Sequence, residues 1–172
     1  MDIKEVLEQH KLWLQDSTTG SRANLRDAYL CDADLSRADL SRAYLCGANL
    51  RDAHLRDAHL RDANLSCANL RGADLRGANL SCANLSCADL RDADLRGAEL
   101  SRATGNNREL KTLQCGTYTV TYTADTMQIG CKRFSIAEWF SFDDDAIDDM
   151  DPGDSLVWWR EWKPLLKEIV CG

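Results

Sequence analysis

Residues 23–40 read ANLRD-AYLCD-ADLSR-ADL, and the same five-residue pattern continues far beyond them. An alanine occupies every fifth position from Ala23 to Ala103, and a leucine occupies every fifth position from Leu25 to Leu100. Asn, Asp, Tyr, His or Glu stands between each alanine and leucine, and two mostly polar residues follow. Self-similarity of this kind indicates a repeat architecture.

A period of five fits neither an α-helix nor a flat strand. Leucines five residues apart are rotated by about 140° on a helix, and they alternate between the two faces of a strand. They face the same way only if the chain turns a corner in every repeat. The small alanine and the turn-favouring Asn or Asp suit such a corner. The sequence therefore predicts a coil wound around an interior of leucine and alanine.

Tandem A(D/N)LXX repeats of this regularity resemble the pentapeptide-repeat family. The resemblance implies a right-handed, four-sided β-helix with four repeats in each coil. The sixteen leucines from Leu25 to Leu100 then give about four coils, with residues 20 apart stacked at roughly 4.8 Å. We therefore expect an all-β solenoid over residues 21–104. Its core ladder is expected to contain Leu25, Leu45, Leu65, Leu85, Ala63 and Ala83.

The segment before the repeats predicts a cap. Residues 3–14 place Ile3, Val6, Leu7, His10, Trp13 and Leu14 close to helical spacing. The open first coil of a solenoid needs a cover, so we expect residues 1–20 to form a capping helix and linker. A partner-binding helix is the alternative interpretation.

The segment after the repeats, residues 105–172, predicts a small α+β domain. The break at 104–107 is rich in turn formers, and residues 110–113 favour a brief extension of the coil. Strands are expected at 118–123 and 127–131, because β-formers dominate there. Ser135 and Glu138 have capping-box spacing, which predicts a short helix through Phe142. Further helices are expected at 143–150 and 155–170, the last containing Pro164.

Charge and cysteine content limit the functional classes. The net charge is −7, with zero over residues 21–103, −2 over residues 1–20 and −5 over residues 104–172. No apolar run approaches the length of a membrane span, and Met1-Asp2-Ile3-Lys4-Glu5 does not open a secretory signal. We therefore expect a cytoplasmic protein with no membrane partner, whose eight cysteines are thiols.

The stacking also predicts candidate partner surfaces. Two adjoining faces carry arginine ladders, which are Arg51, Arg71 and Arg91 on one face and Arg56, Arg76 and Arg96 on the next. These ladders suit an acidic partner or nucleic acid. The alternative, which we favour, is a solvated face balanced by Asp52, Asp57 and Asp92. Direct nucleic-acid binding is accordingly not expected.

The C-terminal residues add aromatic and acidic candidates. Trp158 and Trp162 belong to a tail that holds four of the five tryptophans, and this surface needs burial against the coil, the local hairpin or a second subunit. A homodimer through this region is one prediction. Asp143, Asp144 and Asp145 begin an acidic cluster whose spacing does not fit an EF-hand loop.

No metal or cofactor is expected. Stacked Cys67 and Cys87 would fit disulfide spacing, but in a reducing compartment we expect them to fill a ladder as thiols. No CxxC or HxxxH spacing occurs in the sequence. No nucleophile–base pair or phosphate-cradling loop is evident either, so the sequence predicts a protein that is not an enzyme.

Three functions remain open. The favoured one is a non-enzymatic protein-binding scaffold. The tail and residues 9–14 resemble phage- and prophage-encoded members of the family, which suggests an inhibitor or modulator of a host DNA-handling or defence protein. The resemblance also implies an alternative, a DNA mimic that inhibits or protects DNA gyrase. The neutral repeats count against that role and the acidic tail supports it. The third is a purely structural repeat module.

Overall fold

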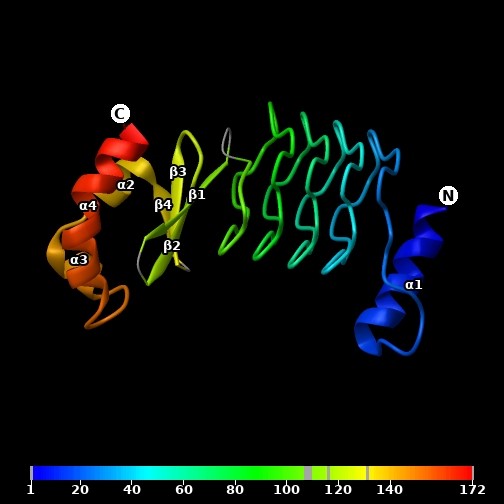
Figure 1. Ribbon diagram of the computed structural model, residues 1–172, viewed down its shortest axis with the longest axis horizontal. Helices are drawn as coiled ribbons and strands as arrows, with labels where there is room; N and C mark the ends of the chain where they lie inside the picture. The colour runs from blue at the N-terminus through cyan, green and yellow to red at the C-terminus, as the bar shows by residue number, and fades with distance from the viewer. Residues whose placement is uncertain (1, 107–109, 116, 131, 172) are drawn as a thin grey trace.

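The protein is a rod of stacked coils with a different cap at each end (Figure 1). A computed structural model describes residues 2–106, 110–115, 117–130 and 132–171. Helix α1 (Ile3–Gln15) lies at one end, and a sheet with three helices lies at the other, so the two termini are far apart. Within these ranges no helix combines the length and apolar character needed to cross a membrane.

Each repeat turns a corner because one of its residues has a left-handed backbone. In the first repeat the Leu25 carbonyl accepts a hydrogen bond from the Ala28 N–H at 3.2 Å, and Asp27 between them has a φ of 54°. A positive φ at the third residue is the mark of a type II turn. Asn or Asp supports the corner from its side chain, as where Asn64 Oδ1 accepts from the Ser66 N–H at 3.0 Å.

The coils stack with a period of twenty residues. One ladder of parallel bridges runs through Asn24, Tyr44, Asn64, Asn84 and Thr104. The Asn64 N–H donates to the Ala43 carbonyl at 3.0 Å, and the Asn64 carbonyl accepts from the Leu45 N–H at 2.7 Å. Four five-residue sides therefore make one coil, as the resemblance implied, and neighbouring coils satisfy each other's backbone groups.

The predicted core ladder is confirmed. Leu25, Leu45, Leu65 and Leu85 are 0% exposed, and Ala63 and Ala83 are 1% and 0% exposed. Leucine fills the column and alanine leaves room for it, so the interior is close-packed without any polar side chain from the repeats.

Helix α1 covers the first coil, as predicted. Its Asp2 side chain caps the helix by accepting from the Lys4 N–H at 2.9 Å. Ile3, Val6 and Leu7 pack against the leucine column, and His10 is 0% exposed. The helix therefore removes the apolar end of the column from water.

His10 joins α1 to the backbone of the first coil. Its Nδ1 accepts from the Ala23 N–H at 3.1 Å, so in the neutral ring Nε2 carries the proton and donates to the Ser41 carbonyl at 3.0 Å. Burial lowers the pKa of His10 below its usual 6.5, against the opposing effect of the Ser41 carbonyl. The cap therefore depends on a neutral imidazole.

Beyond the repeats the chain forms a four-stranded antiparallel sheet. Its order is β1 (Lys111–Cys115), β2 (Tyr118–Tyr122), β3 (Thr126–Ile129) and β4 (Lys132–Ser135). The sequence predicted β2 and β3 but not β1 or β4. The predicted coil extension at 110–113 is only partly right, because Leu110 joins the leucine column whereas Leu113 packs in the sheet. Cys131 and Asn107, included in predicted segments, lie outside the described residues.

Three helices cover the face of the sheet that is turned away from the coils (Figure 1). They are α2 (Ile136–Ser141), α3 (Asp144–Asp148) and α4 (Ser155–Cys171), close to the predicted ranges. The capping box at Ser135 and Glu138 is confirmed. These helices and the sheet enclose a second core around Trp139, Trp158 and Trp159, which is separate from the leucine column.

Candidate partner-binding surfaces

The first arginine ladder is interleaved with carboxylates. Arg51 lies 3.3 Å from Asp52, and Arg71 lies 3.3 Å from Asp92 on the coil above. Arg91 lies 2.5 Å from Asp89, and its hydrogen bonds hold the pKa of Asp89 at about 2. The side chains of this face are half-exposed, so the pairs are solvated and each arginine has an acid beside it.

The second ladder is paired in a similar way. Arg76 lies 2.5 Å from Asp74 and 3.7 Å from Asp94, and Arg96 lies 2.5 Å from Asp94. The hydrogen bond from Arg76 is the main cause that lowers the pKa of Asp74 to about 2. Arg96 lowers the pKa of Asp94 in the same way. Both faces are therefore balanced at neutral pH, which agrees with the favoured interpretation of the ladders.

The carboxylates closest to the ladder arginines are not the ones that the sequence analysis named. Asp52 and Asp57 pair with their neighbours Arg51 and Arg56 at 3.3 and 3.6 Å. The shortest contacts come instead from aspartates in the middle position of the repeat, two residues before an arginine. An Asp-Leu-Arg triplet was the available signal, because the corner brings the first and third side chains together.

The remaining two faces carry more small side chains, although Arg61 on one of them lies 3.4 Å from Asp62. Cys67 and Cys87 stand one coil apart, both exposed and both free thiols. Desolvation, with the Cys87 thiol beside it, raises the pKa of the Cys67 thiol. No group of three His, Cys, Asp or Glu side chains suited to a metal ion is found in the described part of the chain.

Trp158 belongs to the interior of the C-terminal region, and its assignment to a partner surface was wrong. It is 8% exposed, and its indole Nε1 donates to the Cys115 carbonyl at 2.5 Å. Trp162 is half-buried and stacks on Trp158 with ring centroids 6.3 Å apart. The tail aromatics are thus covered by the local hairpin and helices, which was one of the three burial arrangements considered. The exposed apolar residues of α4 are Val157, Leu165 and Ile169.

The acidic cluster is exposed and takes part in local structure. Asp143 caps α3 by accepting from the Ala146 N–H at 2.9 Å. Asp144 lies 2.5 Å from Arg160 of α4, and Asp145 lies in the first turn of α3, where the helix dipole favours a negative charge. The cluster is located at the opposite end of the rod from α1.

Comparison with known proteins identifies the repeats. The family described as pentapeptide repeats matches residues 23–62, 44–81 and 83–107, in eight copies. The chain belongs to this family, whose fold is a right-handed β-helix. No curated protein matches the chain significantly.

The solved structures that match this chain include further pentapeptide repeat proteins. A pentapeptide repeat protein, Rfr23, from the cyanobacterium Cyanothece 51142 is 39% identical over 49% of this chain and 59% of its own, with a TM-score of 0.35. Another, alr5209 from Nostoc PCC 7120, is 32% identical over 54% of this chain and 92% of its own, with a TM-score of 0.29. QnrB1, a plasmid-mediated fluoroquinolone resistance protein, is 29% identical over 52% of this chain and 50% of its own, with a TM-score of 0.24. This chain thus spans less than two thirds of Rfr23 and of QnrB1.

Proposed function

We propose that this protein is a non-enzymatic scaffold that binds another protein, and that the two arginine-bearing faces of its rod, although solvated and balanced in charge, form the contact surface. The observation that carries the proposal is the interleaving of the ladders. Because the coils are stacked, arginine–aspartate pairs such as Arg71–Asp92 and Arg76–Asp74 recur along the rod at the spacing of the coils. A fixed array of alternating charges suits a protein surface of mixed charge, whereas a nucleic acid would require an uncompensated positive field.

The looser resemblance to phage-encoded family members suggests the class of partner. We propose a host protein that handles DNA or takes part in defence. Electrostatic complementarity of this kind gives specificity and a faster association rate more than raw affinity, so binding is expected to weaken as salt increases.

The experiment is capture of a partner from bacterial lysate with the full chain. A stoichiometric partner should be recovered with the native protein and lost when Arg51, Arg71 and Arg91 are all replaced by Glu. The matched control replaces the exposed Lys4, Lys11 and Lys167 by Glu, which changes the net charge equally but leaves the ladders intact. Equal loss in both triple variants would contradict a role for the ladder. Recovery of no partner would favour a purely structural module.

DNA mimicry toward gyrase is a second candidate, and the acidic cluster favours it. Its seven aspartates, Asp143, Asp144, Asp145, Asp148, Asp149, Asp151 and Asp154, are all exposed. A mimic of DNA needs a long negative surface, and the rod does not supply one because its faces are balanced. The cluster would therefore have to act alone. A gyrase supercoiling assay that is unaffected by saturating protein would exclude this role.

A further inference from the structure

The four sides of the last coil do not end in the same way. On the first side, the Leu85 N–H donates to the Thr104 carbonyl at 2.8 Å, as in an ordinary coil. On the second, the Asn106 side chain donates to the Ala88 carbonyl at 2.9 Å. On the fourth, the Leu100 N–H donates to Gln128 Oε1 at 3.0 Å, and Arg133 donates to the Ala98 carbonyl. Side chains thus replace some contacts of the missing coil on the second and fourth sides.

The third side, around Leu95, has no such replacement. In the described part of the chain, no hydrogen bond reaches the N–H groups of Leu95 and Gly97 or the carbonyl of Ala93. The equivalent groups one coil below are all paired. Leu75 and Gly77 donate to Asp94 and Arg96 at 2.9 and 3.0 Å, and the Ala73 carbonyl accepts from Asp94 at 2.9 Å; these contacts show what the open side lacks.

Burial changes at the same place. Leu75 and Ala73 are 0% exposed, whereas Leu95 and Ala93 are only partly buried. An exposed edge that combines unpaired backbone groups with an apolar side chain is a template for pairing with another chain. The third side of the last coil therefore offers both the hydrogen bonds and the apolar contact of a further strand.

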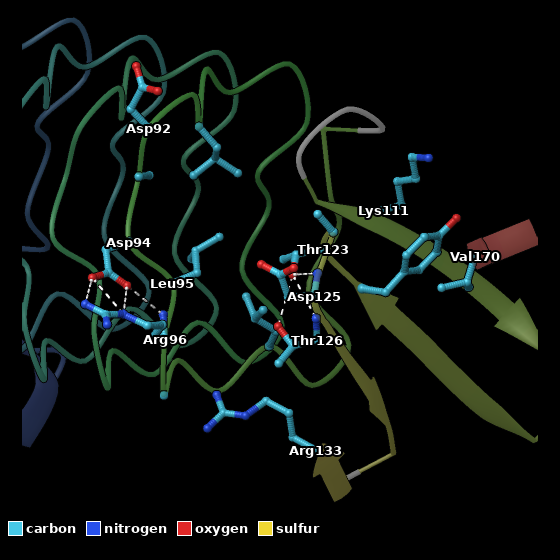
Figure 2. Close-up of a pocket in the computed structure, with 16 residues that line it drawn as sticks. Asp92, Asp94, Leu95, Arg96, Lys111, Thr123, Asp125, Thr126, Arg133 and Val170 are labelled. Carbon is cyan, nitrogen blue, oxygen red and sulfur yellow. Dashed lines mark hydrogen bonds and ion pairs between the residues drawn. The ribbon is translucent and has the colours of Figure 1, made fainter. Parts of the chain in front are cut away.

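A groove adjoins this open side. It has a volume of about 880 Å³ and separates the last coil from the turn between β2 and β3. Figure 2 shows Asp94, Leu95 and Arg96 on the coil side and Thr123, Asp125 and Thr126 on the side of the sheet. Its size lies within the roughly 300–1,000 Å³ typical of ligand-binding pockets.

We propose that this groove binds an extended segment of a partner protein, which adds one more strand to the third side of the last coil. Such pairing is a recurring mode of peptide recognition in which backbone hydrogen bonds supply the affinity. The groove includes Arg96 at the end of the second ladder, but it is separate from the ladder of Arg51, Arg71 and Arg91, and it does not depend on the function proposed for that first ladder.

The paired side one coil below defines how the segment would lie. The Asp94 N–H donates to the Ala73 carbonyl, and the Asp94 carbonyl accepts from the Leu75 N–H. The Arg96 carbonyl accepts from the Gly77 N–H. A segment residue in the equivalent place would donate to the Ala93 carbonyl and accept from the Leu95 N–H. The residue two positions later would accept from the Gly97 N–H. Three hydrogen bonds thus fix a parallel, three-residue stretch.

The side chains of the groove indicate the sequence of the segment. The middle residue of the stretch would take the place that leucine has in every repeat, above Leu95, in a groove whose far side includes Val170 of α4. The charged groups that line the groove are balanced, because its three acids equal its three bases in number; they are Asp92, Asp94, Asp125, Arg96, Lys111 and Arg133. A short polar residue followed by a leucine, as in Asn-Leu, therefore fits better than a charged stretch.

The partner is a different protein and not a second copy stacked end to end. Among the described residues the other coil end is the first coil, and α1 packs over that end through Ile3, Val6 and Leu7. A second copy therefore has no open first coil to stack on Leu95, and pairing of two last coils with each other is the self-association that the exchange test detects.

Amide hydrogen exchange of the free protein gives the first test. The Leu95 and Gly97 amides should exchange at least about a hundredfold faster than those of Leu75 and Gly77, which are paired. Equal protection of the two sets would overturn the proposal, because the side would then be closed. Protection of Leu95 that increases with protein concentration would overturn it in favour of self-association.

The second test titrates blocked pentapeptides against the full chain. The probe is acetyl-Gly-Ala-Asn-Leu-Ser-amide, taken from residues 77–81, and it should slow exchange at Leu95 and Gly97. Methylating the Asn nitrogen, which removes the donor to Ala93, should weaken binding about tenfold or more. Methylating the Leu nitrogen, which points away from the coil, should have a much smaller effect. Equal effects of the two methylations, or no binding at millimolar peptide, would overturn the proposal.

A variant of the protein locates the site. Ala124 is exposed and lines the groove, so Ala124→Trp should fill it and abolish the peptide effect. Ala137→Trp, on the exposed face of α2 outside the groove, is the matched control. Binding that survives Ala124→Trp would place the peptide elsewhere and refute the assignment. Replacing Arg51, Arg71 and Arg91 by Glu should not change peptide binding, so this result is separate from the capture experiment.

Discussion

The rod and the C-terminal region bury apolar side chains in different ways. In the middle coils of the rod every core residue meets its equivalents twenty residues before and after it, and the buried residues of the rod are leucine and alanine. In the C-terminal region the core is built from aromatic rings of distant segments, as where Trp158 donates to the Cys115 carbonyl. The rod is therefore a sum of neighbouring interactions, whereas the C-terminal core requires several elements to be in place together.

A charge in the leucine column should have the largest effect. Leu65 is 0% exposed in a middle coil, so Leu65→Asp would bury an unpaired carboxylate and destabilise the rod by more than about 4 kcal/mol. Loss of the β signal in circular dichroism and of cooperative urea unfolding would be observed. Tyr29→Asp is the control, because that side chain is 79% exposed and aspartate fills the same repeat position elsewhere. A melt like that of the native protein would contradict the placement of Leu65.

Truncation of a central aromatic should damage only the C-terminal region. Trp159 is 2% exposed and packs against Trp139 and Phe140, so Trp159→Ala should cost about 3–5 kcal/mol. Near-ultraviolet circular dichroism would report the lost packing, while the Leu45 and Leu65 amides should stay protected. The control is Val157→Ala on α4, where the side chain is 69% exposed. Loss of protection in the rod as well would show that the two regions unfold as one unit.

Acid should weaken the first cap before it affects the rest of the rod. Burial lowers the pKa of His10 below 6.5, so the unfolded chain binds the proton more readily than the folded one. The free energy of unfolding contributed by this group is therefore fully present above pH 6.5 and falls as the pH drops below that value. The neighbouring charges, Asp39 and Arg22, act in opposite directions on it.

Urea titrations at pH 7.5 and 5.5 measure this dependence. The midpoint should fall on acidification in the native protein, and the fall should be smaller in His10→Gln. His59→Gln, at an exposed repeat position, serves as the control and should keep the native pH dependence. The same pH dependence in both variants would show that His10 is not the responsible group.

Removal of a ladder arginine should have the smallest effect on stability. The Arg71 and Asp92 side chains are 54% and 72% exposed, so their pair at 3.3 Å is largely solvated. Arg71→Ser should change the free energy of unfolding by less than about 0.5 kcal/mol. Serine already occupies the equivalent place in other repeats, as at Ser66 and Ser86. A loss above about 1 kcal/mol in urea titration would mean that the ladder stabilises the rod.

The sequence predicted the rod better than its far end because the two regions encode their contacts differently. Every repeat contains its own corner, so the coil and the burial of Leu65 followed from a single pattern. Strand β1 was missed because its five residues lack a strand signature and are held by pairing with β2, for example Leu113 opposite Val120. Strand β4 was missed for the same reason, because its residues are held in a strand by pairing with β3.

The candidate sites were predicted less completely than the fold. The arginine ladders followed from the twenty-residue spacing, but the main acidic partners, Asp74, Asp89 and Asp94, became evident only from side-chain geometry. Trp158 was assigned to a surface because its burial depends on residues far away in the sequence, including Cys115.

The five-residue period by itself determined that leucine and alanine face inward, because every corner is local and identical, and the stacking of residues twenty apart was implied by the resemblance to the pentapeptide-repeat family. Only the tertiary structure decided how the stack ends. The Leu100 side of the last coil is closed by Gln128 and Arg133, whereas the Leu95 side is left open. That difference depends on how a non-repeating sheet docks on a repeating rod, and no period in the sequence specifies such a contact.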